Sequence, residues 1–290
     1  MQALWMVVGA FLFATMGVCV KLAATGFTVA ELVFYRGAVS AALIWLFMRA
    51  QGTPLRSQVP WMHAWRSLIG NLSLGAWFFA IGALPLATAM TLNYTSGMWI
   101  ALWIVCVESF RRQVSRSQFS LIASVAASFL GVLLVLRPTV EQNQWFAALV
   151  GLASGISAAL AYLQVAALGK AGEPDSRTVF YFAMGSAVVG LIGIGFTGLT
   201  AWTAQNWHAT RWLAPIGILA ALGQLCMTRA YNHGSTMLVA NLQYSAIVFS
   251  AIFSLVLFGD VIPLLGWMGI ILIVVSNIIG TTLRLRPSVS

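Results

Sequence analysis

The sequence is a succession of long apolar runs separated by short breaks, and this pattern restricts the chain to few architectures. The runs cover about residues 4–22, 30–48, 67–83, 86–107, 117–136, 145–168, 178–198, 212–229, 235–258 and 261–283. Each is close to the roughly 20 residues that a helix needs to cross a bilayer. We therefore expect an all-α integral membrane protein with ten transmembrane helices.

Composition supports a membrane protein. Hydrophobic residues make up 60% of the chain and charged residues only 7%, whereas soluble domains carry roughly 25% charged residues. So few charges cannot cover the surface of a soluble domain of this length. The first run, Leu4–Val20, has no basic segment before it and no small-residue cleavage site after it, so we expect a retained first span.

The basic residues predict the orientation. A net charge of +9 would suggest nucleic-acid binding in a soluble protein, but here the charges lie mostly in short breaks and no nucleic-acid partner is expected. With a cytoplasmic N-terminus, eleven basic residues lie at or near the inside and four toward the outside, as the positive-inside tendency requires. The inner set is Arg49, Arg56, Arg66, Arg111, Arg112, Arg116, Lys170, Arg177, Arg229, Arg284 and Arg286, and the outer set is Lys21, Arg36, Arg137 and Arg211. We expect a multi-pass protein of the cell (inner) membrane with both termini cytoplasmic.

A short internal repeat suggests two related halves. Leu92-Asn93-Tyr94-Thr95 is echoed 150 residues later by Leu242-Gln243-Tyr244-Ser245, each early in a long apolar run. If each half has five helices, the second copy enters the membrane from the opposite face, which is the inverted repeat of alternating-access carriers. We expect repeats over 1–138 and 142–286.

The chain resembles the EamA type of the drug/metabolite transporter superfamily. The resemblance rests on Phe13-Ala14-Thr15-Met16 through Lys21, on Arg36 and Arg66, on Ala83–Ala89, and on Phe258-Gly259-Asp260. In the first half, Glu108-Ser109-Phe110-Arg111 stands near the position of that last motif without matching it. The resemblance implies a ten-helix fold with a central cavity and small organic substrates, such as amino acids, carboxylates, nucleotide-related compounds, vitamins or drugs.

Polar residues inside the apolar runs are the candidate substrate-binding residues, because polar groups in a membrane need a partner. Asn93 and Tyr94, with Gln243 and Tyr244, lie at matched depth in the two halves and are the first choice. Asn71, Tyr162, Gln164 and Gln224 are further candidates for the cavity. The alternative for all of them is interhelical hydrogen bonding that only holds the bundle together.

Arg36 lies about a turn inside its run. It would attract anions in an outer vestibule, or it would snorkel or pair with Glu31, five residues away. Lys21 fits a snorkelling residue at a helix end. Trp77 would line an apolar pocket, or it would pack in the core or against lipid. Gly151 and Gly155 predict close packing of their helix against a neighbour.

Missing motifs narrow the mechanism. No Asp or Glu lies near the middle of a run, which disfavours a midplane carboxylate as proton relay. Gly169-Lys170 is followed by Ala171, so no phosphate-binding loop of the GxxxxGK[ST] type occurs. Cys19, Cys106 and Cys226 lie within apolar runs and suggest packing residues. We expect no metal, no cofactor and no enzymatic activity, because the runs offer no convergent catalytic groups.

The sequence therefore predicts a carrier of small organic metabolites working by alternating access. Basic residues without midplane acids favour a carboxylate-bearing solute, such as an amino acid or organic acid. The alternative is an exporter of aromatic or apolar compounds, drugs, purines or vitamins such as flavins, with Trp77, Trp99 and Trp103 lining its pocket. A monomer and a homodimer both remain open.

Overall fold

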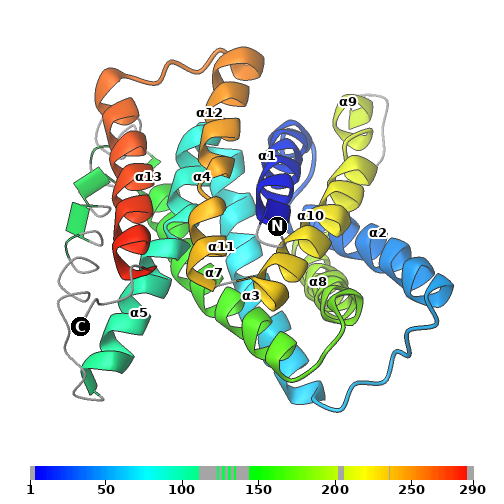
Figure 1. Cartoon of the computed structure of the whole chain (residues 1–290). Helices are drawn as coiled ribbons and strands as arrows, with labels where there is room; N and C mark the ends of the chain where they lie inside the picture. The colour runs from blue at the N-terminus through cyan, green and yellow to red at the C-terminus, as the bar shows by residue number, and fades with distance from the viewer. Residues whose placement is uncertain are drawn as a thin grey trace.

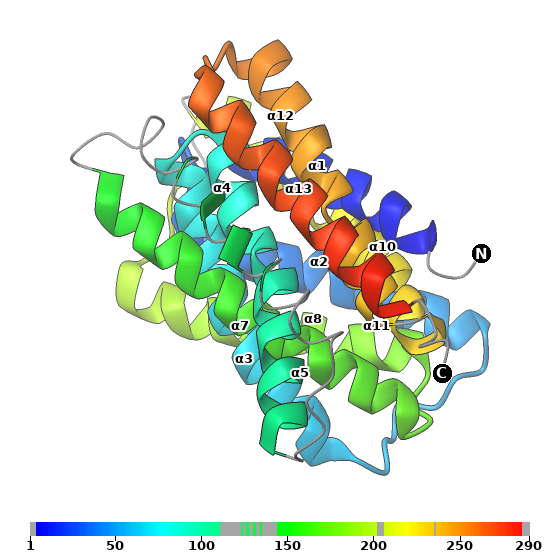
Figure 2. The ribbon, with the colours of Figure 1, turned by 60° about the vertical axis from the view of Figure 1, so that its left-hand side comes forward.

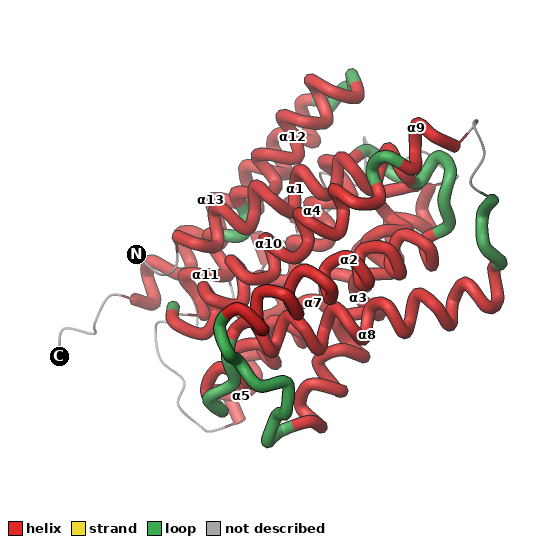
Figure 3. The backbone as a smooth tube through the Cα atoms, turned by 90° about the vertical axis from the view of Figure 1, so that its right-hand side faces the viewer, coloured by secondary structure: helices red, strands yellow, loops and turns green. Residues whose placement is uncertain are grey.

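The protein folds as a bundle of helices (Figure 1). The computed structural model describes residues 4–110, 144–201, 206–234 and 236–285, with isolated positions between 123 and 134. Every regular element in these ranges is a helix, and the connections are mostly short (Figure 3). The predicted all-α class is confirmed for this part of the chain.

The helices follow the predicted runs closely in most places. They are α1 (Trp5–Ala23), α2 (Val29–Ala50), α3 (Pro60–Ala83), α4 (Leu86–Tyr94), α5 (Ser96–Phe110), α7 (Trp145–Lys170), α8 (Asp175–Thr197), α9 (Trp207–Thr210), α10 (Leu213–His233), α11 (Thr236–Leu242), α12 (Ser245–Phe258) and α13 (Leu264–Leu285). The predicted run 117–136 lies outside the described residues, apart from the isolated positions.

Six helical segments among the described residues are long and apolar enough to cross a membrane. They are Trp5–Ala23, Val29–Ala50, Trp145–Lys170, Asp175–Thr197, Trp207–His233 and Leu238–Phe258. Large apolar side chains such as Phe196, Val256 and Leu264 are mostly exposed on the outside of the bundle. An exposed apolar surface of this kind fits a lipid environment.

The third predicted run, 67–83, starts too late. Helix α3 begins at Pro60, where proline takes the first helical position because the missing N–H has no partner there in any case. His63 and Arg66 lie inside this helix and are buried. Their polarity ends the apolar run in the sequence, although the helix itself continues through them.

The predicted runs 86–107 and 235–258 are each interrupted at the echoed motif. Helix α4 ends at Tyr94, and α11 ends at Leu242. In the first break the Thr95 hydroxyl donates to the carbonyl of Leu92 at 2.6 Å, and in the second the Ser245 hydroxyl donates to the carbonyl of Leu242 at 2.7 Å. Hydroxyls bonded to nearby carbonyls compete with the helical ladder. The sequence echo therefore marks two equivalent helix interruptions.

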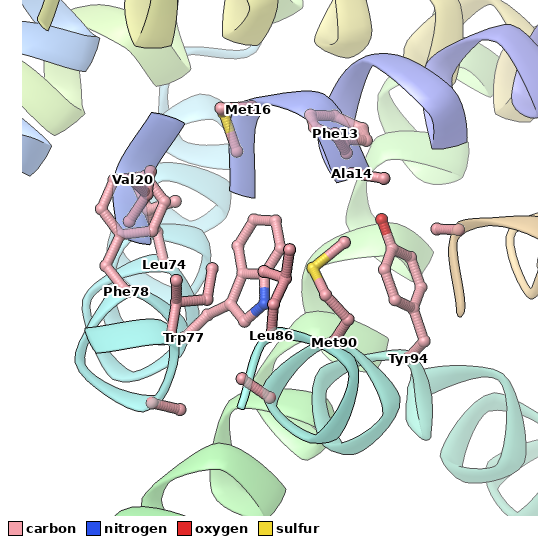
Figure 4. Packing of buried hydrophobic residues seen from close by; sticks show 14 of the residues in the cluster. Phe13, Ala14, Met16, Val20, Leu74, Trp77, Phe78, Leu86, Met90 and Tyr94 are labelled. Carbon is pink, nitrogen blue, oxygen red and sulfur yellow. The ribbon is translucent and has the colours of Figure 1, made fainter. Parts of the chain in front are cut away.

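Helices from residues 4–110 pack mainly against helices from residues 144–285. α1 contacts α10 and α12, α2 contacts α8 and α10, α3 contacts α7 and α8, and α4 contacts α7 and α12. Helix α7 also contacts α5 (Figure 2). The core between these helices includes Phe13, Met16 and Val20 of α1, Leu74, Trp77 and Phe78 of α3, and Leu86, Met90 and Tyr94 of α4 (Figure 4).

Glycine allows the closest approach between the two segments, where α2 meets α8. A Cβ atom at Gly37 would lie 2.8 Å or less from backbone atoms of Ala183, Ser186 and Ala187. On α7, Cβ atoms at Gly151 and Gly155 would press into α4, which confirms the predicted close packing there. Small residues at helix interfaces permit such backbone contacts in membranes.

We expect Gly37→Ala to destabilise the protein by about 1–3 kcal/mol, because the added methyl group meets backbone that cannot rotate away. Gly75→Ala is the matched control, since a Cβ atom there meets nothing within 4 Å. It should stabilise α3 by about 0.5–1 kcal/mol through helix propensity. Thermal unfolding of both variants in one detergent tests this, and equal midpoints would contradict the close crossing.

Candidate functional site

A small buried cavity lies between seven helices from both segments. Its polar lining is Arg36, Arg66, Ser73, Asn93 and Gln224, and its aromatic lining is Phe13, Trp77, Tyr94, Tyr162 and Phe182. The cavity volume is about 40 Å³, which is room for a few water molecules. The helices therefore leave little room at the site in this conformation.

Six of the ten predicted site residues line this cavity, namely Arg36, Trp77, Asn93, Tyr94, Tyr162 and Gln224. Asn93 is held in place by α7, because its side-chain amide donates to the Ser154 hydroxyl at 3.0 Å. Ser154 in turn donates to the carbonyl of Gly151 at 2.6 Å. The amide oxygen and the second N–H of Asn93 are therefore left for a solute.

The other four predicted residues, Asn71, Gln164, Gln243 and Tyr244, do not line the cavity. Gln243 is fully buried in a separate network: its amide donates to Ser96 at 2.9 Å, and its oxygen accepts from Tyr231 at 3.2 Å. Tyr231 stacks on Tyr162, with ring centroids 5.5 Å apart. Gln243 thus reaches the cavity only through two aromatic rings.

Tyr244 and Asn71 have surroundings of their own. The phenol of Tyr244 lies so close to Gly97 that no side chain would fit at that position. Asn71 donates to the carbonyl of Ser67 at 2.7 Å, one turn earlier in α3. In this conformation Tyr244 therefore packs against α5, and Asn71 bonds to the backbone of its own helix.

Arg66 is the charged cavity residue that the sequence does not single out, because it lies just before an apolar run, where basic residues are expected near the membrane surface. It is 3% exposed, and its guanidinium carbon lies 4.1 Å from the centre of the Phe182 ring. A Cβ atom at Gly70, four residues later, would overlap the Arg66 guanidinium. The sequence signal for a buried Arg66 is the glycine at i+4, in a helix that begins at Pro60.

Arg36 joins Arg66 at the same ring. Its guanidinium carbon lies 5.1 Å from the centre of Phe182, and it donates one hydrogen bond of 3.3 Å to Ser186. The Nε atoms of both arginines and Nη1 of Arg66 are buried without a hydrogen-bond partner. The sequence alternative of an Arg36–Glu31 pair is not what forms: Glu31 instead accepts from Thr28 and Thr200.

The acids whose side chains the structure describes all have partners away from this cavity. Glu173 contacts His63, Arg177 and Ser57, Asp175 accepts from Asn232, and Asp260 accepts from Ser254. The face of an aromatic ring compensates a cation by about 0.5–2 kcal/mol, far less than the cost of a buried charge without a partner. Among the described residues, the two guanidinium groups therefore have no counter-charge, and the cavity attracts anions.

A second polar cluster lies near the start of α3. Glu173, in the loop between α7 and α8, accepts hydrogen bonds from Ser57 at 2.7 Å and Arg177 at 3.0 Å, and His63 lies 3.2 Å away. Arg177 also donates to the carbonyl of Pro54 at 3.0 Å. Burial raises the pKa of Glu173, but the hydrogen bonds from these neighbours outweigh it and hold the pKa below its usual value.

Comparisons with known proteins give the family. The model of the EamA-like transporter family matches residues 145–281. The chain is 32% identical over 272 residues to a pseudopaline exporter of Pseudomonas aeruginosa, covering 94% of this chain and 93% of that protein. The chain belongs to the EamA-like transporter family. As a member of this family it is a membrane-embedded transporter of small molecules, which confirms the resemblance seen in the sequence.

This EamA-like transporter also matches a second transporter in sequence and a solved structure in fold. It is 26% identical over 237 residues to a riboflavin transporter of Rhizobium johnstonii, covering 79% of this chain and 74% of that protein. A solved crystal structure with 15% sequence identity superposes with a TM-score of 0.71 and covers 97% of this chain and 98% of the other. That likeness shows that the fold is shared.

We expect Arg66→Met to raise the free energy of unfolding by on the order of 1–3 kcal/mol, because it removes a buried charge that lacks a counter-charge. Arg177→Met is the matched control and should lower it, since Arg177 bonds Glu173 and Pro54. Thermal midpoints in one detergent decide the question. If Arg66→Met loses as much stability as Arg177→Met, the unpaired state of Arg66 is refuted.

We expect the Glu173 cluster to stabilise the protein by about 1–3 kcal/mol at neutral pH. Because the pKa of folded Glu173 is below the ordinary value of 4.5, this contribution is complete above pH 4.5 and is lost as the pH falls through the lower folded-state pKa. The difference in thermal midpoint between the wild type and Glu173→Gln should therefore shrink as the pH falls from 7 to below 4.5. A constant difference would contradict the assignment.

Proposed function

We propose that this transporter carries a small carboxylate-bearing solute, an amino acid or organic acid, by alternating access through the central cavity. The observation that carries the proposal is the pair of buried guanidinium groups, Arg36 and Arg66, beside a single ring with no described acid near them. Guanidinium groups bind carboxylates through paired, charge-assisted hydrogen bonds. Asn93, Tyr162 and Gln224 would hold the rest of the solute.

The proposed architecture is ten transmembrane helices in two inverted repeats, 1–138 and 142–286, with both termini cytoplasmic in the cell membrane. The pattern of helix contacts supports it. If α1, α2, α3 and the α4–α5 pair correspond to α7, α8, α10 and the α11–α12 pair, the α1–α10 contact corresponds to α7–α3, and α1–α12 to α7–α5. The matching interruptions after Tyr94 and Leu242 support the same correspondence.

Alternating access requires closures at both ends of the cavity. The Glu173 cluster at the start of α3 joins the loop after α2 to the loop after α7. At the other end of α3, Lys21 donates to the carbonyl of Leu84 at 2.6 Å and lies 5.4 Å from the centre of the Phe258 ring. We propose that these contacts are the two gates. Because the cavity is formed within one chain, we also propose that a monomer is sufficient for transport.

An exporter of aromatic or apolar compounds, including flavins, is the second candidate. Phe13, Trp77, Tyr94 and Tyr162 give the cavity aromatic walls, and one relative is named a riboflavin transporter. Trp99 and Trp103, expected in that pocket, instead line a separate apolar hollow between α5 and α7. The charge of the two arginines favours the carboxylate.

Purified protein in liposomes tests the proposal by uptake of labelled amino acids, organic acids, purines and flavins. We expect carboxylates to be preferred, and a preference for cationic solutes would refute the electrostatic argument. Asn93→Ala should lower transport about tenfold, as loss of one hydrogen bond to the solute would, and keep the thermal midpoint of the wild type within a few degrees.

Gln243→Ala is the companion variant. It leaves Tyr231 and Ser96 without their shared partner, so we expect a loss of about 1–3 kcal/mol in stability. Transport per folded molecule should change less than in Asn93→Ala. If Asn93→Ala folds and transports normally, Asn93 does not bind the solute and the proposed site is wrong.

A further inference from the structure

The central cavity holds two positive charges rather than one. We propose that the solute bound in the closed state is a dianion, with two carboxylates or one phosphate monoester, and not an amino-acid zwitterion. This inference rests on the proposed function, because it assumes that the solute binds between Arg36 and Arg66.

The geometry places both charges beside one aromatic ring. Arg36 comes from α2 and Arg66 from α3, yet both guanidinium carbons lie within 5.1 Å of the centre of the Phe182 ring. Like charges repel strongly when little water separates them. Within the part of the chain that the structure describes, these two groups make one hydrogen bond, from Arg36 to Ser186, so N–H groups of both arginines remain for an anion.

The amount of charge then selects the solute. A zwitterion adds no net charge and leaves both guanidinium charges uncompensated, a monocarboxylate compensates one, and a dianion compensates both. The described lining also lacks an acid for the ammonium group of an amino acid: its neutral polar members are Ser73, Asn93, Tyr94, Tyr162 and Gln224. A buried ammonium without a carboxylate partner is costly.

The small size of the cavity also favours a dianion. With a volume of about 40 Å³, the site has room for only a few water molecules, so little solvent is present to screen the two arginines. The helices must separate to admit an organic solute and then close around it. Closure removes most of the water, and the remaining counter-charge has to come from the solute.

Binding to purified full-length protein tests the inference with pairs of probes that differ in one charge. The pairs are succinate with its monoamide succinamate, and glutarate with its monoamide glutaramate, at pH 7.5. Glycerol 3-phosphate separates phosphate monoesters from dicarboxylates. We expect at least one dicarboxylate, or glycerol 3-phosphate, to bind about tenfold or more tightly than the corresponding monoanion or alanine, a difference of about 1.4 kcal/mol.

Arg66→Gln is the variant that removes one positive charge and keeps a polar side chain. Removing one guanidinium should bring the ratio of dicarboxylate to monoamide affinity close to one, and Arg66→Lys should keep the preference for the dianion. Arg49→Gln is the control, because Arg49 is exposed at the end of α2 and stacks on Trp45. It should leave the wild-type ratio unchanged.

The wild-type ratios alone keep the inference testable if Arg66→Gln fails to fold. Equal affinity for the two members of each pair without tighter binding of glycerol 3-phosphate, or tighter binding of alanine, overturns the dianion while leaving a carboxylate carrier in place. If no anionic probe binds and the liposomes take up no carboxylate, the proposed function fails as well. A preference for the dianion that persists in Arg66→Gln removes Arg66 from the site.

Discussion

The cost of burying charge away from water organises this transporter. Two guanidinium groups lie in a closed cavity around Phe182, and no described carboxylate compensates them. An isolated buried charge is unfavourable in any protein interior, and intramembrane ionisable residues are typically functional for this reason. The fold holds these charges because neighbouring helices are packed tightly enough to fix them, as at Gly70, where only hydrogen leaves room for Arg66.

The acids are arranged in the complementary way. Glu31 caps α2 and binds Thr200, Glu173 binds the loop before α3, and Asp260 follows α12. Acids at helix ends can bond to backbone N–H groups and hydroxyls while staying near the membrane surface. The cavity between the two helix segments is therefore electropositive, whereas near the start of α3 the carboxylate of Glu173 is paired with Arg177. A transporter built this way would hold an anion most firmly when both ends are closed.

Two helix interruptions are accompanied by hydroxyl side chains that bond to nearby carbonyls. Thr95 and Ser245 each bond a carbonyl three residues earlier, at equivalent points of the two segments. Beside the first interruption Asn93 faces the cavity and α7, whereas beside the second Gln243 faces Ser96 and Tyr231. Asn93 and Gln243 therefore make different contacts, although they stand at matching positions of the echoed sequence motif.

The sequence by itself determined the helical class, most helix positions and the family, because lipid requires long apolar helices whose backbone bonds are satisfied internally. It also indicated six of the cavity residues, since polar side chains are conspicuous in apolar runs. Only the tertiary structure decided that Arg66 belongs to the cavity and Gln243 to a neighbouring network. Hydropathy records how polar a residue is, whereas the helix rotation and the neighbours across an interface decide what that residue faces.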